Sequence, residues 1–526
     1  MKKGLGVFSI LCLFGLSTIA QIDFKLYSYA IDLTQSPKIQ VMAKVEYEKL
    51  SDQKLLFLDL VAENGATGMK INRVYNDKNQ FLNYQHHGDT LQIFLKNIAP
   101  GNGTVYLDYE GIPADGLIIG KNKHGNPTSF GDNWPNRARN WLALKDHPSE
   151  KAKLEFMVRV KKGFDCIANG ELQRVMQIDD TSQVYHWKTR YELPSKVMVI
   201  GVADFSIDTL EAKTPLPISS WVYPEDEVNG FKEYAKSEDI LIFFEQRIAP
   251  YPFEKLANVQ STTRYGGMEN ASCIFYHENS TKGDGSCEML IAHELAHQWF
   301  GNTVTESAWA HLWLSEGFAT YFTEVYRQET YGDEAYHEAM LLNARVSFDF
   351  YKKDPRPVVD SLEQDPNKLL NRNVYQKAAF LLHMIRDSIG DPAFFSAIGK
   401  YYEENKYANA DSRTMIQYFE KESNRDIWSW IAPYLHVPGH PKLKLSWTQS
   451  RSKLTLEFEQ TQDFDFGPIK FALRLQGEEK EKEFAIRMNT KKTSLSLKVP
   501  FDVSQISFGK RAYSLVELES IKTISQ

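Results

Sequence analysis

The chain has few cysteines and no excess of basic charge. Only 4 of its 526 residues are cysteine, and 68 acidic residues outnumber 61 basic ones, for a formal net charge of −7. A disulfide scaffold is therefore excluded, although one pair could form among Cys166, Cys273 and Cys287, and their spacing does not say which. The basic surface of a nucleic-acid-binding protein is also missing, so we expect no nucleic-acid partner.

Long hydrophobic runs are absent after the first residues. The chain opens with "MKKGLGVFSILCLFGLSTIAQ", in which two lysines precede an apolar run from Gly6 to Leu16 and small residues end at Ala20. This run is shorter than the ~20 residues that a bilayer needs, so the pattern predicts a signal peptide over residues 1–20. We expect a protein that is periplasmic or secreted, without a membrane span after cleavage. An uncleaved anchor is the alternative.

The hydrophobic period changes twice along the remaining chain. From about residue 23 to 210, segments such as "VMAKVEY" and "TVYLDY" alternate apolar and polar residues, which indicates antiparallel sheet. From about residue 230 the period is helical, as in "CEMLIAHELAHQWFG", "WLSEGFATYFTEVYRQE" and "NVYQKAAFLLHMIRDSI". After "LHVPGHPKL" alternation returns in "KLTLEF" and "IKFALRL".

These changes predict a multidomain α+β protein. The expected parts are a signal peptide at 1–20, a β domain at 21–212, a mainly helical domain at 213–437 and a small β-sandwich at 438–526. No repeat or low-complexity tract interrupts this order. The charged run "GEEKEKEF" is expected to be a solvated hairpin loop.

The stretch "HELAHQWFGNTVT" has the spacing of a metal site. His293 and His297 are four residues apart, so on a helix they point the same way and can share one metal ion. Glu294 projects about a third of a turn away, where it can hold a metal-bound water and take its proton. The alternative is an amphipathic helix whose histidines are ordinary core or surface residues.

Catalytic zinc needs a third protein ligand. Glu316, in "WLSEGFATYF", stands on the next expected helix, with eighteen residues between it and His297, an interval that suits a helix turning back beside the first. Zinc held by two histidines and a glutamate lowers the pKa of its bound water to about 7. The sequence therefore predicts a hydrolytic site with one zinc ion.

Three motifs together resemble a known family. "YGGMENAS", "HELAHQWFGNTVT" and "WLSEGFATYF" follow one another in the order typical of the gluzincin zinc aminopeptidases of the aminopeptidase N and leukotriene A4 hydrolase type. The resemblance covers most of residues 25 to 440. It implies an N-terminal antiparallel β saddle domain, a thermolysin-like catalytic domain and removal of residues from the free N-terminus of peptides.

The same resemblance assigns substrate contacts. It implies an edge strand that lines the cleft and in which Glu269 binds the α-ammonium group, formed by Gly266, Gly267, Met268, Glu269 and Asn270. A carboxylate at this place binds a positively charged terminal amine. The two glycines allow a peptide backbone to approach closely. Tyr375, in "NVYQKAAFLLHM", matches the tyrosine that stabilises the oxyanion in the family. By periodicity alone it could be a core aromatic residue.

Two departures from the family stand out. Family members place a Gln or Glu of the saddle domain beside the amine-binding glutamate, but counting back from Asp146 leads to Trp134 in "FGDNWPNRAR". Asp132, Asn133 or Trp134 is expected there, and the alternative is that the amine is held differently. Many members also carry a large helical C-terminal domain, whereas the last folded unit here is a β domain. A more open cleft, or a cleft capped by a second subunit, follows as a hypothesis.

The sequence thus predicts a zinc-dependent aminopeptidase. An epoxide hydrolase on the same scaffold and a catalytically inactive interaction module are alternatives, but neither a ligand nor the base is lost. An endopeptidase would lack "GGMEN", so Glu269 favours exopeptidase action.

Overall fold

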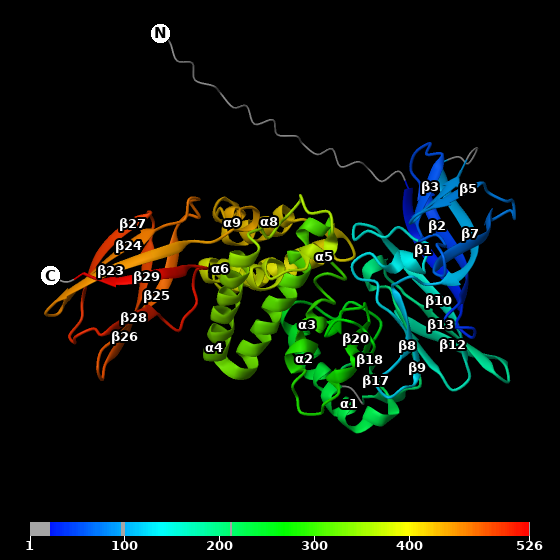
Figure 1. The fold of residues 1–526 in the computed structure, drawn as a ribbon, viewed down its shortest axis with the longest axis horizontal. Helices are drawn as coiled ribbons and strands as arrows, with labels where there is room; N and C mark the ends of the chain where they lie inside the picture. The colour runs from blue at the N-terminus through cyan, green and yellow to red at the C-terminus, as the bar shows by residue number, and fades with distance from the viewer. Residues whose placement is uncertain (1–21, 96–99, 211–212, 525–526) are drawn as a thin grey trace, which may run out of the picture.

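The computed structural model describes residues 22–95, 100–210 and 213–524, and its fold is α+β. Sheets form the N-terminal part, helices dominate the centre, and sheets return at the C-terminal end, so the two sheet regions lie on opposite sides of the helices (Figure 1). This confirms the predicted class. The expected signal peptide lies outside the described residues. None of the helices in the described ranges has the length and apolar character that crossing a membrane requires.

An eight-stranded sheet dominates the N-terminal part. Its main path has the order β12-β13-β10-β1-β2-β7-β4, with β14 paired to β10, and all neighbours are antiparallel except β1 and β10. The strands are β1 (Ile22–Asp32), β2 (Ile39–Lys49), β4 (Gly68–Asn76), β7 (Gly101–Ile112), β10 (Lys151–Lys161), β12 (Glu171–Asp179), β13 (Ser182–Lys188) and β14 (Leu193–Pro194). Along β2 every second side chain is buried, because one face packs on the core and the other meets solvent.

Two smaller sheets complete this part. One has the order β11-β15-β9-β8 and the other β3-β6-β5. Their strands are β3 (Leu55–Asp59), β5 (Tyr84–His87), β6 (Thr90–Phe94), β8 (Leu117–Lys121), β9 (Pro127–Gly131), β11 (Asp165–Ala168) and β15 (Ile200–Ala203). Short 3-10 turns occur at Ala138–Asn140 and Ser195–Val197. The loop after β9 leads toward the central part of the molecule.

The central part contains a five-stranded sheet as well as helices. Its order is β16-β17-β18-β20-β19, which leaves β19 at one edge. The strands are β16 (Ser206–Thr209), β17 (Ile218–Val222), β18 (Leu256–Ser261), β19 (Gly267–Met268) and β20 (Cys273–His277). The sequence pattern indicated mainly helices here, because β18 is buried at every position and therefore shows no alternation.

Nine α-helices belong to the central part within the described residues. They are α1 (Glu227–Tyr234), α2 (Lys236–Arg247), α3 (Glu288–Ala296), α4 (Trp313–Lys353), α5 (Pro366–Leu369), α6 (Ala378–Ile389), α7 (Asp391–Asn405), α8 (Ser412–Ser423) and α9 (Trp428–His436). The π-helical turn η6 (Asn373–Lys377) leads into α6, and β21 (Thr305–Glu306) pairs with β22 (Asn409–Ala410). Gly332, with φ of 88°, kinks α4, so the helix turns and its first half packs beside α3.

Two further sheets enclose a separate core at the C-terminal end. Their orders are β27-β24-β23-β29 and β26-β25-β28. The strands are β23 (Lys442–Ser450), β24 (Lys453–Gln460), β25 (Ile469–Gln476), β26 (Glu481–Met488), β27 (Lys492–Lys498), β28 (Gln505–Phe508) and β29 (Glu517–Thr523). Both sheets contribute to one hydrophobic cluster, for example Leu456 and Leu473. Only the first half of the charged run, residues 477–480, forms the turn between β25 and β26, whereas residues 481–484 begin β26 and pair with β25.

Candidate metal centre

Three predicted ligands meet where α3 and α4 pack together. His293 lies in the last turn of α3, His297 follows that helix directly, and Glu316 lies in the first turn of α4. The two Nε2 atoms are 3.2 Å apart, and Oε2 of Glu316 is 3.5 Å from Nε2 of His293 and 3.3 Å from Nε2 of His297. The helical spacing of the histidines and the return of α4 therefore produce one compact donor set.

This donor set fits a zinc ion. Ligand atoms at the usual 2.0–2.1 Å from a tetrahedral zinc lie roughly 3.3–3.4 Å from one another. The three observed separations, 3.2 to 3.5 Å, bracket that value. Two imidazole nitrogens and one carboxylate oxygen are also donors that zinc prefers, and three protein ligands leave a fourth position open. A second set of three residues, Glu269, Glu294 and His297, also has its ligand atoms close together. It has only one residue, His297, in common with the first set.

The ring of His297 is held in the orientation that a ligand requires. Its Nδ1 donates to the carbonyl oxygen of Phe300 at 3.1 Å, and Oγ of Ser315 lies 3.1 Å from the same nitrogen. With Nδ1 engaged in this way, Nε2 faces Glu316 and is the nitrogen that would bind a metal after losing its proton. Gly301, with φ of 116°, allows this approach, because a Cβ atom there would collide with Ser315.

The buried charges of the donor set stabilise one another. Burial alone would lower the pKa of His297, but the carboxylates of Glu316 and Glu269 raise it to about 9. Burial likewise opposes ionisation of Glu316, yet the two histidines hold its pKa well below the usual range. Burial lowers the pKa of His293. Glu316 is therefore a carboxylate, ready to bind a cation.

Glu294 lies beside the donor set without belonging to it. Burial raises its pKa well above the usual range, and Glu269 and Glu316 add to this effect while His297 opposes it. Its side chain packs against Gly267 so closely that a Cβ atom at that position would overlap the carboxylate. A carboxylate with a raised pKa accepts a proton readily, which is what a general base requires.

Tyr375 faces the metal ligands from η6. Its ring stacks on the ring of His293 with centroids 6.0 Å apart and an interplanar angle of 21°. Burial, together with the carboxylates of Glu316, Glu269 and Glu294, raises the pKa of its hydroxyl well above the usual range. The hydroxyl therefore stays protonated and is available as a hydrogen-bond donor.

Glu269 lies just beyond edge strand β19 and carries a carboxylate oxygen without a partner. Oε1 is buried and accepts no hydrogen bond from any described residue. The backbone is held firmly instead, because the carbonyl oxygen of Glu269 accepts hydrogen bonds from Nε2 of Gln298 at 2.9 Å and Nδ2 of Asn302 at 2.6 Å. An unpaired buried carboxylate oxygen is costly unless a cation binds to it.

These residues line a cavity of about 250 Å³. Its lining includes nearly all of the expected site residues: four of the five "GGMEN" residues, the three metal ligands, Glu294 and Tyr375. Asn270 is the exception, since it is fully buried and does not line the cavity. The complete lining is Trp134, Tyr265, Gly266, Gly267, Met268, Glu269, Leu290, His293, Glu294, His297, Glu316, Leu370 and Tyr375.

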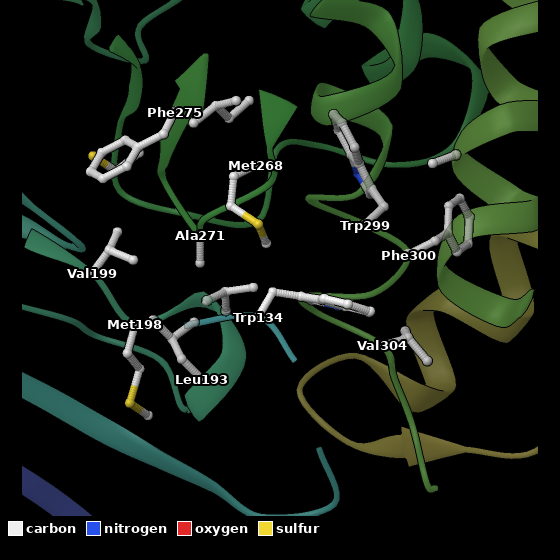
Figure 2. Close-up of a cluster of buried hydrophobic side chains, with 14 of the residues drawn as sticks. Trp134, Leu193, Met198, Val199, Met268, Ala271, Phe275, Trp299, Phe300 and Val304 are labelled. Carbon is white, nitrogen blue, oxygen red and sulfur yellow. The ribbon is translucent and has the colours of Figure 1, made fainter. Parts of the chain in front are cut away.

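Of the three expected saddle residues, only Trp134 reaches this cavity. Figure 2 shows it in the buried cluster that includes Met268, Ala271 and Trp299. Asp132 pairs instead with Arg137 and accepts a bond from Thr263. Oδ1 of Asn133 accepts a bond from Nε1 of Trp141 at 2.8 Å, and its amide donates to backbone carbonyls. Both polar side chains are buried and satisfied by the protein, so neither is directed into the cavity.

Some residues at the site were not identified from the sequence. Ser315 precedes the third ligand, and Gln298 and Asn302 stand inside the quoted motif, so proximity to the ligands was the available signal. Leu290 and Leu370 gave no signal, because a leucine on a helix or in a loop is typical of any core. Cys166, Cys273 and Cys287 are buried free thiols, and none forms a disulfide.

Comparisons with known proteins agree with this geometry. Residues 233–434 match the peptidase family M1 domain. The chain is 25% identical over 436 residues to a leucyl aminopeptidase of Saccharolobus solfataricus, which covers 78% of this chain and 53% of the relative. It is 28% identical over 377 residues to tricorn protease-interacting factor F2 of Thermoplasma volcanium, and the match covers 65% of this chain and 45% of that relative. It is 27% identical over 317 residues to human endoplasmic reticulum aminopeptidase 2, and the match covers 57% of this chain and 31% of that relative.

The chain spans about half the length, or less, of these relatives. The matched region nevertheless contains both motif histidines, Glu269, Glu316 and Tyr375, which the fold brings to one cavity. Over residues 233–434 the chain is similar to peptidase family M1.

Proposed function

We propose that this protein is a zinc-dependent aminopeptidase, which removes residues from the free N-terminus of peptides. The observation that carries the proposal is the position of Glu269. One oxygen of its buried carboxylate has no partner, and it shares a group of atoms within 4.8 Å of one another with Glu294 and His297. A cation bound by Glu269 would therefore lie beside the base and the metal ligands, as an N-terminal ammonium does when the first peptide bond is cut.

His293, His297 and Glu316 would hold one zinc ion. Zinc there would polarise the carbonyl group of the first peptide bond and activate water for attack. The carboxylate of Glu294 takes a proton from the attacking water and transfers it to the leaving nitrogen. The hydroxyl of Tyr375 donates a hydrogen bond to the carbonyl oxygen as that oxygen gains negative charge.

Glu269 positions the substrate. Its carboxylate accepts hydrogen bonds from the α-ammonium group, and charge-assisted bonds of this kind are about twice as strong as neutral ones. Its backbone carbonyl is already fixed by Gln298 and Asn302, so the carboxylate is held in place before the substrate arrives. An acylated N-terminus carries no positive charge and is excluded.

The finer assignments belong to the same proposal. We infer that the N-terminal sheets form a saddle domain, that the central part is a thermolysin-like catalytic domain, and that the two C-terminal sheets form a β-sandwich. The pattern of the first 21 residues supports export to the periplasm or the exterior. Peptides with a free N-terminus are the proposed partners.

The proposal is tested by hydrolysis of alanyl-, leucyl- and arginyl-p-nitroanilide beside their N-acetylated forms, with and without a zinc chelator. We expect cleavage of the free-amine substrates only, lost on chelation and restored by zinc. Equal cleavage of the blocked substrates would indicate an endopeptidase. No cleavage by zinc-loaded protein would indicate the inactive module or the epoxide hydrolase that the scaffold also permits.

A further inference from the structure

The cavity wall beside Glu269 is aromatic. Trp134 reaches it from the loop after β9, and Tyr265 from the segment before β19. Their rings meet edge to face, with centroids 6.0 Å apart and an interplanar angle of 87°. Burial raises the pKa of Tyr265, and the carboxylates of Asp132 and Glu269 raise it further against Arg137 and Arg264. The paired rings of Trp134 and Tyr265 therefore line the same cavity as Glu269.

The ring of Trp134 is held in one orientation. On another side it meets the ring of Trp309 edge to face, with centroids 5.8 Å apart. It is only 2% exposed, although it lines the cavity. Two aromatic neighbours and nearly complete burial leave the indole no room to rotate, so the surface that it offers a substrate is preformed.

Trp134 offers carbon atoms rather than a polar group. Its Nε1 is shielded and has no hydrogen-bond partner among the described residues. The shielded Nε1 therefore offers a substrate no hydrogen bond, and any contact with the side chain is made by its carbon atoms. Such a carbon surface attracts cations and alkyl groups, and toward an N–H group it offers only a weak N–H···π contact in place of a hydrogen bond to oxygen.

Among the carboxylates that line the cavity, Glu269 alone is available for a substrate amine. Glu316 binds the two histidines, and Glu294 lies over Gly267 as the base. Outside the cavity, Oε1 of Glu306 is paired with Nζ of Lys196 at 2.6 Å. One carboxylate has two oxygens, which suffice for two N–H groups. The third substituent of the ammonium nitrogen then faces the aromatic wall.

Resting on the aminopeptidase function proposed above, we propose that Trp134 is a specificity-determining residue through which the site accepts N-alkylated amino termini, such as N-methyl residues and proline, beside primary amines. A secondary ammonium has two N–H groups, which match the two oxygens of Glu269. Its alkyl substituent lies against the indole, where a hydrogen-bonding side chain would instead leave a polar group unpaired. The positive charge next to the ring adds a cation–π attraction.

The inference is tested on the zinc-loaded full chain by comparing kcat/KM for alanyl-, N-methylalanyl-, prolyl- and N-acetylalanyl-p-nitroanilide. We expect the N-methylalanyl and prolyl substrates to be cleaved within about tenfold of the alanyl substrate, and the acetylated one not at all. Trp134→Gln should lower the N-methylalanyl to alanyl ratio by about tenfold, mainly through KM. Trp134→Phe, which keeps an aromatic ring, should preserve the ratio. Trp430→Gln, a half-buried tryptophan of α9 outside the cavity, is the matched control.

The outcomes separate the two proposals. If the alanyl substrate is not cleaved, the aminopeptidase function fails. If it is cleaved while the secondary amines are slower by a thousandfold or more, the inference about Trp134 fails and the function stands. An unchanged ratio in a folded Trp134→Gln variant also overturns it. Zinc content and the melting temperature show whether the Trp134→Gln variant is folded. If it is not, the comparison of the secondary-amine and alanyl substrates with wild-type protein decides the inference.

Discussion

Gly267 lies directly against the side chain of Glu294, at a distance that leaves no room for a Cβ atom. Edge strand β19 and helix α3, which carries two of the proposed zinc ligands, are in contact at this point, so the strand limits where the proposed base can lie. The relationship explains why a glycine stands here: the side chain of Glu294, not the backbone conformation of position 267, needs the space.

Gly267→Ala should lower kcat with little effect on folding. The added methyl group displaces the Glu294 carboxylate, and a displacement of about 1 Å can lower the rate by about 100-fold. Kinetics with alanyl-p-nitroanilide, together with zinc content, would measure this. Gly120→Ala, where a Cβ atom meets nothing within 4 Å, is the matched control. Full activity of the Gly267→Ala variant would contradict the close packing.

Glu294→Gln should lower kcat by about 100- to 10,000-fold, because the amide cannot take a proton from water. The residue is not among the three ligands, so bound zinc should remain at one ion per chain, as measured by atomic absorption. KM should change little, since the side chains have the same shape. Loss of zinc together with activity would assign Glu294 to the metal instead.

Glu269→Gln should raise KM for free-amine substrates. It removes the charge that balances the buried ammonium, and breaking a buried charge pair lowers kcat/KM by roughly 30- to 1,000-fold. The variant should also lose most of the discrimination between alanyl-p-nitroanilide and its N-acetyl form. If the preference for the free amine persists unchanged, another group must recognise it.

Tyr375→Phe should lower kcat by about 100- to 1,000-fold, the usual effect of losing one donor to a developing oxyanion. The stacking on His293 needs only the ring, so zinc affinity and the melting temperature should be unchanged. Steady-state kinetics with a zinc titration would separate the two effects. A variant that retains wild-type kcat would leave Tyr375 as a packing residue.

Glu150, far from the cavity, provides a test of pH-dependent stability. Burial raises its pKa from 4.5 to about 7, although Oε1 accepts a bond from the backbone N–H of Phe24 at 3.2 Å. Between those values the folded state binds more protons than the unfolded state, so this group's contribution to stability is lost as pH rises. Relative to Glu150→Gln, which retains the acceptor oxygen, the wild-type free energy of unfolding should fall by roughly 1–3 kcal/mol from pH 4.5 to 7.5.

Urea unfolding at half-unit pH steps measures the effect. Glu479→Gln, in the exposed hairpin between β25 and β26, is the control and should follow the wild-type curve. Parallel curves for wild type and Glu150→Gln would show that Glu150 ionises alike in both states.

Local spacing made the zinc ligands predictable from the sequence. The separation of His293 and His297 matches one turn of helix, whereas the edge strand at "GGMEN" was expected only from the family resemblance. The three blocks of alternating, helical and again alternating period gave the α+β order, since each period reflects a single buried face.

The predictions that were wrong or incomplete concerned features that depend on tertiary contacts. Strand β18 is buried on both faces and has no period to detect. Counting residues led to Asp132, Asn133 and Trp134 together, but adjacent side chains in a loop point in different directions. Arg137 and Trp141, which bond to Asp132 and Asn133, decide which of them remain free, and no local pattern contains that information.

The two hydrogen bonds to the carbonyl oxygen of Glu269 fix the distance between this residue and the candidate metal ligands. Gln298 and Asn302, which fix its backbone, belong to the same ten-residue stretch that carries His293 and His297. The interval between the residue that would hold the first atom of a substrate and those that would hold the metal is therefore set within one short piece of chain. Under the proposed function, a fixed length of this kind would shorten peptides of any size by one residue at a time.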